Sequence, residues 1–142
     1  KLYALSQKAA FSKDAVLAAL ETVRTVDIHK ADGTRADNFV HQLRQDGDDQ
    51  WLFIAHGKEP YNKDISRYQD LRIRIAGEWV PTVYNTMTGE KETIDFTVSG
   101  GRTEVRTRMY DYDSLLLWLA SIACISIAIM IDDNTPRNTG TW

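Results

Sequence analysis

The sequence predicts an all-β protein, an antiparallel two-sheet β-sandwich with a jelly-roll-like arrangement and a short N-terminal helix. From residue 24 onward, short β-branched and aromatic runs follow the two-residue period of strands, and glycine or aspartate turns separate them at fairly regular spacing. The 142 residues are also enough to bury a core without disulfides or metals. We expect a single domain over 1–142, made of a helical leader at 1–23, the sandwich at 24–131 and a tail at 132–142.

The leader is predicted to be helical over 13–22. Ser12 is a suitable N-cap and Asp14 falls in the first turn, where a negative charge favours the helix dipole. One apolar stripe follows at helical spacing: Val16, Leu17, Leu20 and Val23.

The sandwich is predicted to contain nine strands. Glycine supplies the positive φ that tight turns between them need, as in Asp32-Gly33 and Thr88-Gly89. The expected strands are about 24–30, 38–45, 50–56, 70–76, 78–86, 91–98, 102–109, 114–119 and 122–131.

Two kinds of strand are distinguishable by their side chains. Leu71 to Ile75 alternates apolar residues with arginines, which is typical of a strand with one face in water. Trp51 to Ala55 and Leu115 to Leu119 are continuously apolar, which is typical of a strand at the centre of a sheet or covered on both faces. We therefore expect Trp51 and Trp118 in the core.

The uncharged run from Leu115 to Ile131 is at the short limit for a membrane-spanning helix. Its second half alternates isoleucine with smaller residues at the period of a strand, and aspartates rather than basic anchors flank it. Two successive buried strands explain the run better, and we expect no membrane contact.

Charge argues against nucleic acid as a partner. The 17 basic and 20 acidic residues give a net charge of −3 and are interleaved along the chain. The single cysteine, Cys124, does not indicate a redox compartment. The chain begins without methionine, so we expect it to be part of a longer protein whose signal peptide, if it has one, lies upstream.

The order of the turn and strand motifs over 23–119 resembles a family. The motifs are Asp32-Gly33 with Gln42-Leu43-Arg44, the run from Asp46 to Ala55, Gly77-Glu78-Trp79, the run from Thr86 to Glu90, and the run from Tyr112 to Leu116. In this order they resemble the C-terminal β-sandwich accessory domain of large bacterial glycoside hydrolases of the α-L-rhamnosidase and β-galactosidase-like type. The isoleucine run after Leu119 departs from that pattern.

The resemblance implies a noncatalytic, carbohydrate-binding-type domain whose partner is the catalytic domain of the parent glycoside hydrolase. It also implies an extracellular or cell-surface location in a bacterium.

We expect no enzymatic activity from the chain itself. His29, His41 and His56 lie on separate predicted strands without metal-ligand spacing, and no nucleophile elbow or phosphate-binding loop is present. Nor is a cofactor expected. Aspartates cluster at 46–49 and at 132–133, as oxygen ligands of a structural calcium would, but solvated turns explain both clusters as well.

Aromatic side chains are the stronger indication of a binding site. Sugars stack their C–H faces on Trp or Tyr rings while polar side chains bind the hydroxyls. The long irregular segment from His56 to Gln69 is the best binding-loop candidate. The predicted carbohydrate-binding residues are Trp79, Tyr61, Tyr68 and Tyr84, with Asn62, Arg67 and Asn85 beside them.

Two functions follow from these residues. The first is a carbohydrate-binding module that directs an attached glycoside hydrolase to plant cell-wall polysaccharide, a β-glycan of the xylan or cellulose type. The alternative is a purely structural domain that packs against the catalytic barrel and binds no sugar. A small free-standing hydrolase is a remote third.

Overall fold

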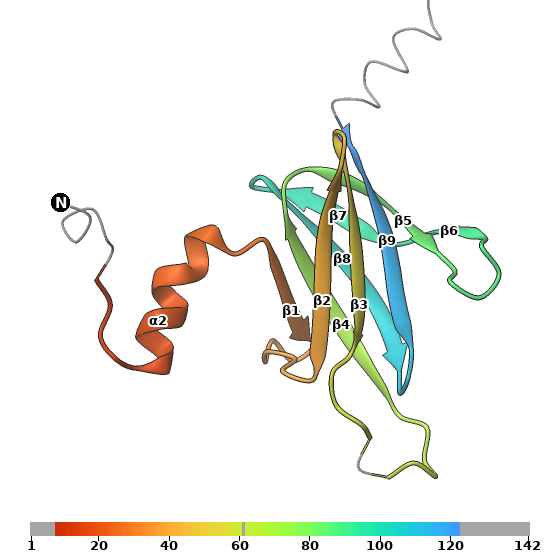
Figure 1. Cartoon of the computed structure of the whole chain (residues 1–142), viewed down its shortest axis with the longest axis horizontal. Helices are drawn as coiled ribbons and strands as arrows, with labels where there is room; N and C mark the ends of the chain where they lie inside the picture. The colour runs from red at the N-terminus through yellow and green to blue at the C-terminus, as the bar shows by residue number, and fades with distance from the viewer. Residues whose placement is uncertain (1–7, 61, 123–142) are drawn as a thin grey trace, which may run out of the picture.

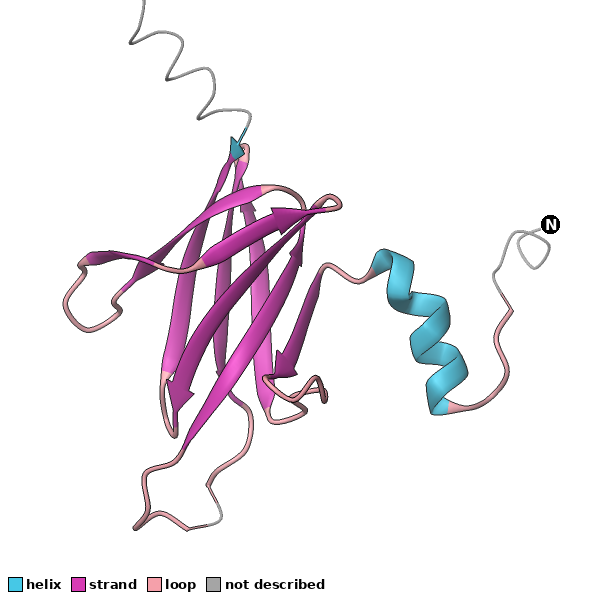
Figure 2. Ribbon diagram, turned by 180° about the vertical axis from the view of Figure 1, so that it is seen from behind, coloured by secondary structure: helices cyan, strands magenta, loops and turns pink. Residues whose placement is uncertain are grey.

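Two antiparallel sheets packed face to face form the protein (Figures 1 and 2). A computed structural model describes residues 8–60 and 62–122. The four-stranded sheet has the order β1 (Val26–Lys30), β4 (Tyr68–Ala76), β8 (Arg102–Tyr110) and β7 (Phe96–Ser99). The five-stranded sheet has the order β2 (Phe39–Asp46), β3 (Asp49–His56), β9 (Ser114–Ser121), β5 (Trp79–Tyr84) and β6 (Lys91–Thr93). The predicted fold class is confirmed.

The chain passes repeatedly from one sheet to the other, as between β3 and β4 and between β8 and β9. This alternation is typical of jelly-roll-like sandwiches. Successive side chains of a strand point to opposite faces, so each strand sends every second residue into the space between the sheets. The buried core comes from both inner faces: Val26, Ile28, Ala36, Leu52, Ile54, Leu71, Ile73, Ile75, Val105, Met109, Leu115, Leu117 and Leu119.

The helix α2 (Lys13–Leu20) starts where the sequence predicts. Ser12 caps it, since its Oγ accepts a hydrogen bond of 3.2 Å from the backbone N–H of Ala15. The predicted end at residue 22 falls in a short 3-10 turn, η1 (Glu21–Val23). The helix stands to one side of the sandwich (Figure 1), and none of its residues is buried.

The predicted strand 91–98 is wrong as a single element. β6 pairs with β5 in the five-stranded sheet, whereas β7 pairs with β8 in the four-stranded sheet. The chain changes sheets at Ile94 and Asp95, where Ile94 packs against the core and the carbonyl of Asp95 accepts a hydrogen bond of 3.1 Å from the N–H of Arg106. Residue alternation does not reveal such a crossing, because Ile94, Phe96 and Val98 keep the period of two through it.

β9 extends the predicted 114–119 by two residues. The predicted strand 122–131 lies outside the described residues except for Ile122, which is not part of a strand. Within the part of the chain that the structure describes, no helix is long and apolar enough to cross a membrane.

β3 and β9 lie at the centre of the five-stranded sheet, as their continuous apolar runs predict. The core placement of Trp51 and Trp118 is nevertheless wrong. Leu52 and Leu117 point inward, so their neighbours Trp51 and Trp118 point outward, where the two indole rings pair at 6.5 Å and are half-buried. One face of these strands is core, and the other is an apolar outer surface.

Candidate functional site

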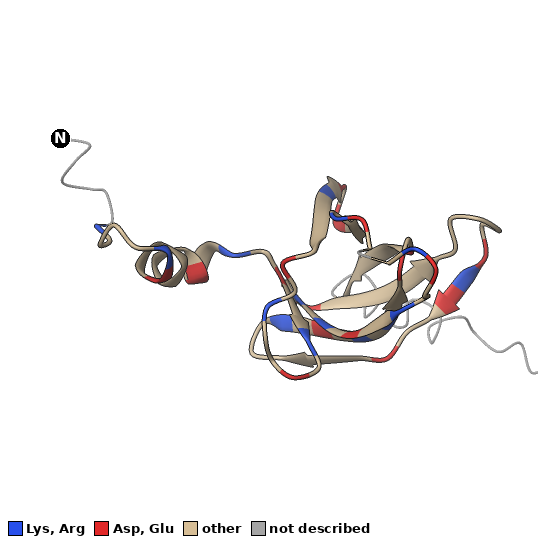
Figure 3. Cartoon of the chain, turned by 90° about the horizontal axis from the view of Figure 1, so that it is seen from below, with Lys and Arg blue, Asp and Glu red and all other residues tan. Residues whose placement is uncertain are grey.

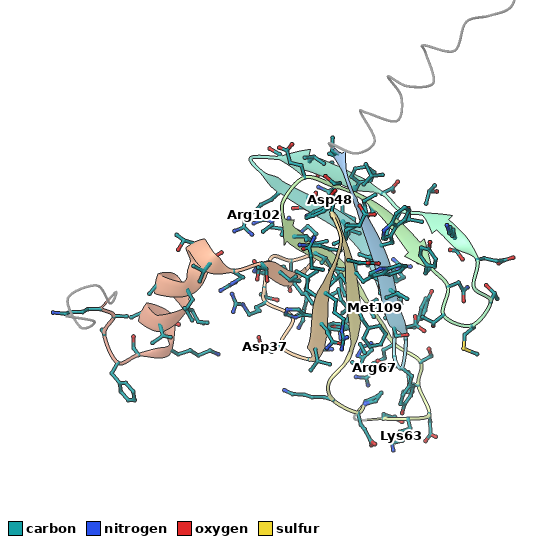
Figure 4. The ribbon with its side chains drawn as sticks, turned by 45° about the horizontal axis from the view of Figure 1, so that its top comes forward. Asp37, Asp48, Lys63, Arg67, Arg102 and Met109 are labelled. Atoms are coloured by element: carbon teal, nitrogen blue, oxygen red, sulfur yellow. The ribbon has the colours of Figure 1, made fainter. Side chains whose placement is uncertain are left out.

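The predicted binding loop is the connection between β3 and β4, over residues 57–67, at one end of the sandwich (Figure 1). A groove of about 460 Å³ opens beside it, and Asn62, Arg67 and Tyr68 line it together with side chains from the ends of β1 and β3. Figure 4 shows Arg67 at the same end of the molecule as Lys63, with Arg102 and Asp48 toward the opposite end. Three of the seven predicted site residues thus meet in one groove.

Local hydrogen bonds set the shape of this loop. The backbone N–H of Arg67 donates to the Asp111 carboxylate at 3.1 Å, and the N–H of Asp111 donates to the Arg67 carbonyl at 2.9 Å. These two bonds tie the loop to the turn between β8 and β9 and leave the Arg67 side chain exposed. Asn62 accepts a hydrogen bond of 2.9 Å from the N–H of Asp64, which is an Asx turn.

Tyr68 is the aromatic side chain of the groove and is 52% exposed. Tyr110, its partner across the β4–β8 ladder, meets it edge to face with 5.8 Å between ring centroids. The Arg108 guanidinium lies 3.9 Å from the Tyr68 ring centroid, within cation–π range. The pair therefore presents two exposed rings beside a cation.

Asp70 holds Arg108 in that position. Two hydrogen bonds of 2.7 and 3.2 Å join the guanidinium to the two carboxylate oxygens. These hydrogen bonds lower the pKa of Asp70 below its usual value and raise the pKa of Arg108. Tyr68 thus has a neighbouring charge that is fixed in direction.

The groove also holds an unsatisfied acceptor. The side-chain oxygen of Gln69 is buried and has no hydrogen-bond partner among residues 8–60 and 62–122. His56 is engaged, because its Nε2 lies 2.9 Å from the Tyr110 carbonyl and its ring packs on Phe39 with centroids 4.5 Å apart. A buried amide oxygen at the wall of a groove is suited to accept a hydrogen bond from a bound hydroxyl.

The outer face of β4 and β8, on which Tyr68 and Tyr110 also lie, is strongly charged. Six charged residues alternate with inward-pointing ones there, and we call this set the arginine face: Asp70, Arg72, Arg74, Glu104, Arg106 and Arg108. A depression of about 680 Å³ lies over it, lined in part by Arg72, Arg106 and Arg108. Charged residues of both signs are otherwise spread over the helix and the sandwich (Figure 3).

The remaining predicted residues lie elsewhere. The Trp79 ring packs against the core. Its Nε1–H donates a hydrogen bond of 2.7 Å to the Ala76 carbonyl, and its backbone N–H donates one of 2.8 Å to the Thr103 hydroxyl.

Tyr84 lies on the outer face of the five-stranded sheet. The Trp51 ring centroid is 5.0 Å from the Tyr84 ring centroid, and the Lys91 ammonium is 5.2 Å from it. Asn85 accepts hydrogen bonds from the N–H groups of Met87 and Thr88 in the turn after β5. Tyr61 lies outside the described residues.

Arg108 and Tyr110 are the site residues that the sequence-based prediction missed. Both follow the strand period outside the predicted binding loop, so no local pattern marks them as site residues. The signal that links them to Tyr68 is the β4–β8 register, which pairs Tyr68 with Tyr110 and Asp70 with Arg108. That register depends on contacts between strands that are distant in sequence.

A second surface is the outer face of the five-stranded sheet. Its register places apolar side chains from four neighbouring strands side by side. Val40 is 56% exposed and Phe53 is 39% exposed. We call this set the apolar face: Val40, Trp51, Phe53, Tyr84, Leu116 and Trp118.

Histidines and acidic residues do not gather into a metal centre in the described part of the chain, where no group of three or more potential ligands is found. In the 46–49 turn, Asp46 accepts a hydrogen bond from the Trp51 indole at 3.1 Å and Asp49 accepts one from the N–H of Ser121 at 3.0 Å. The aspartates at 132 and 133 lie outside the described residues. His29 lies beside Asp27, with 3.2 Å between Nδ1 and Oδ2.

Comparison with solved structures adds a likeness of fold. No protein-family model and no curated protein matches the chain. A solved structure of a rhamnosidase from Novosphingobium sp. PP1Y is similar, with a TM-score of 0.59 and 17% identity over 78% of this chain. The aligned part is 10% of the rhamnosidase chain. At this identity the likeness establishes the fold, which is that of one segment of a much longer enzyme.

Proposed function

We propose that this chain is a noncatalytic accessory domain of a glycoside hydrolase and that it binds carbohydrate in the groove beside Tyr68. The observation that carries the proposal is the meeting of Asn62, Arg67 and Tyr68 in one groove of about 460 Å³. An exposed ring with hydrogen-bonding groups around it is the usual composition of a sugar site. The likeness to a segment of a rhamnosidase supports the attachment to a glycoside hydrolase.

The groove provides both parts of sugar recognition. Tyr68 and the adjoining Tyr110 offer exposed ring surface for a pyranose ring, and Arg108 packs on the Tyr68 ring. The exposed Arg67 side chain and the buried oxygen of Gln69 offer a donor and an acceptor for hydroxyl groups. In the proposed role this groove keeps the attached enzyme on its polysaccharide, outside the cell or at its surface.

Affinity electrophoresis in gels that contain soluble xylan or soluble cellulose derivatives tests this function. The wild-type chain should be retarded, and Tyr68→Ala should lose most of the retardation because the ring is the main apolar contact. Tyr84→Ala is the matched control, since it removes the same ring from the opposite face of the sandwich. Loss with Tyr84→Ala but not with Tyr68→Ala would reject the groove as the site.

The apolar face favours a second function, which is packing against the catalytic part of the parent protein without sugar binding. Val40 and Phe53 are apolar but exposed in this chain, and exposed apolar patches of this kind mark interfaces. In this role Phe53→Asp should lower the melting temperature of the full-length parent. In the isolated chain the same change should cost only about 1 kcal/mol, because Phe53 points to solvent there. Equal effects in both contexts would reject the packing role.

A further inference from the structure

The arginine face has more positive charge than its own carboxylates neutralise. Four guanidinium groups and two carboxylates lie on the outer face of β4 and β8, which leaves an excess of two positive charges. The whole chain has the opposite sign, with a net charge of −3. The excess is therefore a local feature of this surface.

The two carboxylates are already occupied. Asp70 binds Arg108 through both oxygens. Glu104 is shared by two cations, with Oε2 3.1 Å from Nε of Arg74 and Oε1 3.2 Å from Nε of Arg106. Burial acts to raise the pKa of Glu104, but the hydrogen bonds from the two arginines outweigh it and hold the pKa below its usual value.

Arg72 and Arg106 stand directly opposite each other in the β4–β8 register. Like charges at such positions destabilise a sheet unless an anion lies between them. Arg72 makes a single hydrogen bond, of 3.2 Å from Nη2 to the Ala31 carbonyl, and no carboxylate lies within ion-pair distance of it among the described residues.

The carboxylates near Arg72 are occupied by other groups. Asp32 interacts electrostatically with Arg72, but its Oδ1 is occupied by the hydroxyl and the N–H of Thr34 at 2.7 and 2.8 Å. Asp27, on the adjacent strand, is bound by Arg24 at 2.7 Å and by Arg35 at 3.6 Å. The depression of about 680 Å³ lies over Arg72, Arg106 and Arg108.

Exposed tyrosines adjoin this cationic depression on the same face. Tyr68 and Arg72 are four residues apart on β4, which at about 3.3 Å per residue places them about 13 Å apart along the strand. An oligosaccharide, rather than a single sugar ring, spans that length. Guanidinium groups bind carboxylate in a planar, two-point geometry, which makes arginine the suitable residue for an acidic sugar.

We propose that the arginine face binds an acidic saccharide, with a carboxylate of the sugar seated between Arg72 and Arg106 and a ring further along the saccharide on Tyr68 and Tyr110. This ligand class rests on the proposed carbohydrate-binding function and makes it more specific. The adjoining tyrosines favour a saccharide over a featureless polyanion, because exposed aromatic rings match the C–H faces of sugar rings.

Affinity electrophoresis with four polymers tests the proposal: polygalacturonate, the same polymer fully methyl-esterified, neutral xylan, and polyglutamate. Polygalacturonate should retard the chain most, and esterification should weaken the effect because it removes the carboxylate charge. Arg72→Gln and Arg106→Gln should each weaken binding to polygalacturonate about tenfold, as expected for loss of a charge-assisted hydrogen bond. Arg44→Gln is the control for charge, since Arg44 is exposed on the outer face of the five-stranded sheet.

Each contrary outcome has a distinct meaning. Retardation by xylan but not by polygalacturonate overturns the acidic ligand and leaves the proposed function in place. Retardation by no polysaccharide overturns both. Equal retardation by polyglutamate, or an equal loss with Arg44→Gln, shows general attraction of charge and overturns the site. Thermal unfolding followed by circular dichroism verifies that each variant is folded.

Discussion

Thr103 connects the two sheets at the start of β5, and its hydroxyl should account for a measurable part of the stability. The side chain is completely buried (0% exposed). Its Oγ1 accepts a hydrogen bond of 2.8 Å from the N–H of Trp79 and donates one of 3.0 Å to the carbonyl of Gly77. Thr103→Val keeps the shape and removes both bonds.

The size of the effect follows from the Trp79 N–H and the Gly77 carbonyl, which both lose their hydrogen bond to Thr103. An unsatisfied buried donor or acceptor costs about 1 to 3 kcal/mol. Gly77 and Trp79 are only half-buried, so each cost lies toward the lower limit and we expect a total loss of about 2 to 3 kcal/mol. Thr103→Ser keeps the hydroxyl and removes one methyl group, which should cost about 1 kcal/mol.

Urea unfolding followed by tryptophan fluorescence measures these changes. With a slope of about 1 to 3 kcal/mol per molar urea, Thr103→Val should lower the midpoint by about 1 M or more. Thr82→Val is the matched control, because the Thr82 side chain is on the outer face and its hydroxyl has no hydrogen-bond partner among the described residues. If Thr103→Val is no less stable than Thr103→Ser, the hydroxyl does not stabilise the connection between the sheets.

Three further predictions use the same unfolding measurements. Gly77→Ala should cost more than Gly47→Ala. Both glycines have positive φ, but a Cβ at Gly77 would lie 2.5 Å from Nε1 of Trp79, whereas a Cβ at Gly47 meets nothing within 4 Å. Equal losses of unfolding free energy in the two variants would show that the indole moves aside freely. Leu117→Ala should cost about 2 to 5 kcal/mol of stability because Leu117 is fully buried, and Leu116→Ala on the apolar face should cost distinctly less. The reverse order would show that the core lies on the Leu116 face of β9. The pKa of Asp70 is lowered in the folded state, so its contribution to stability is present above the unfolded-state pKa and is lost as the pH falls through the folded-state pKa. Asp70→Asn should therefore make the loss of stability at acid pH less steep. Asp64→Asn is the control and should leave that loss unchanged, because it removes a carboxylate without an ion-pair partner among the described residues.

Predictable and unpredictable features differ in the range of the interactions that produce them. The cap at Ser12 and the central strands β3 and β9 follow from local patterns, and the structure confirms them. The division of 91–98 between two sheets was missed because the alternation of side chains runs through it unchanged. The outward position of Trp51 was missed because a continuously apolar strand gives no sign of which face is the inner one.

The residues of the candidate site also divide into those that a local pattern identifies and those that depend on tertiary contacts. Tyr68, Arg67 and Asn62 come from one loop and its strand, so a single segment of sequence identified all three. Trp79 was selected for the same aromatic chemistry, but the close approach of its ring to Gly77 and its hydrogen bond to Ala76 place it against the core. Residue type alone does not separate an indole that stacks on a ligand from one that fills a core.

By itself, the sequence determined that this chain forms a sandwich of short antiparallel strands behind a helix, because the period of two and the glycine turns are encoded residue by residue. Only the tertiary structure decided which residues from distant strands become neighbours. The β4–β8 register sets Tyr68 beside Tyr110 and Arg72 opposite Arg106, and a shift of one residue would turn those side chains into the core. The physical reason is that register comes from packing between strands some 30 or more residues apart in the chain, as in the Arg74–Glu104 pair, 30 residues apart.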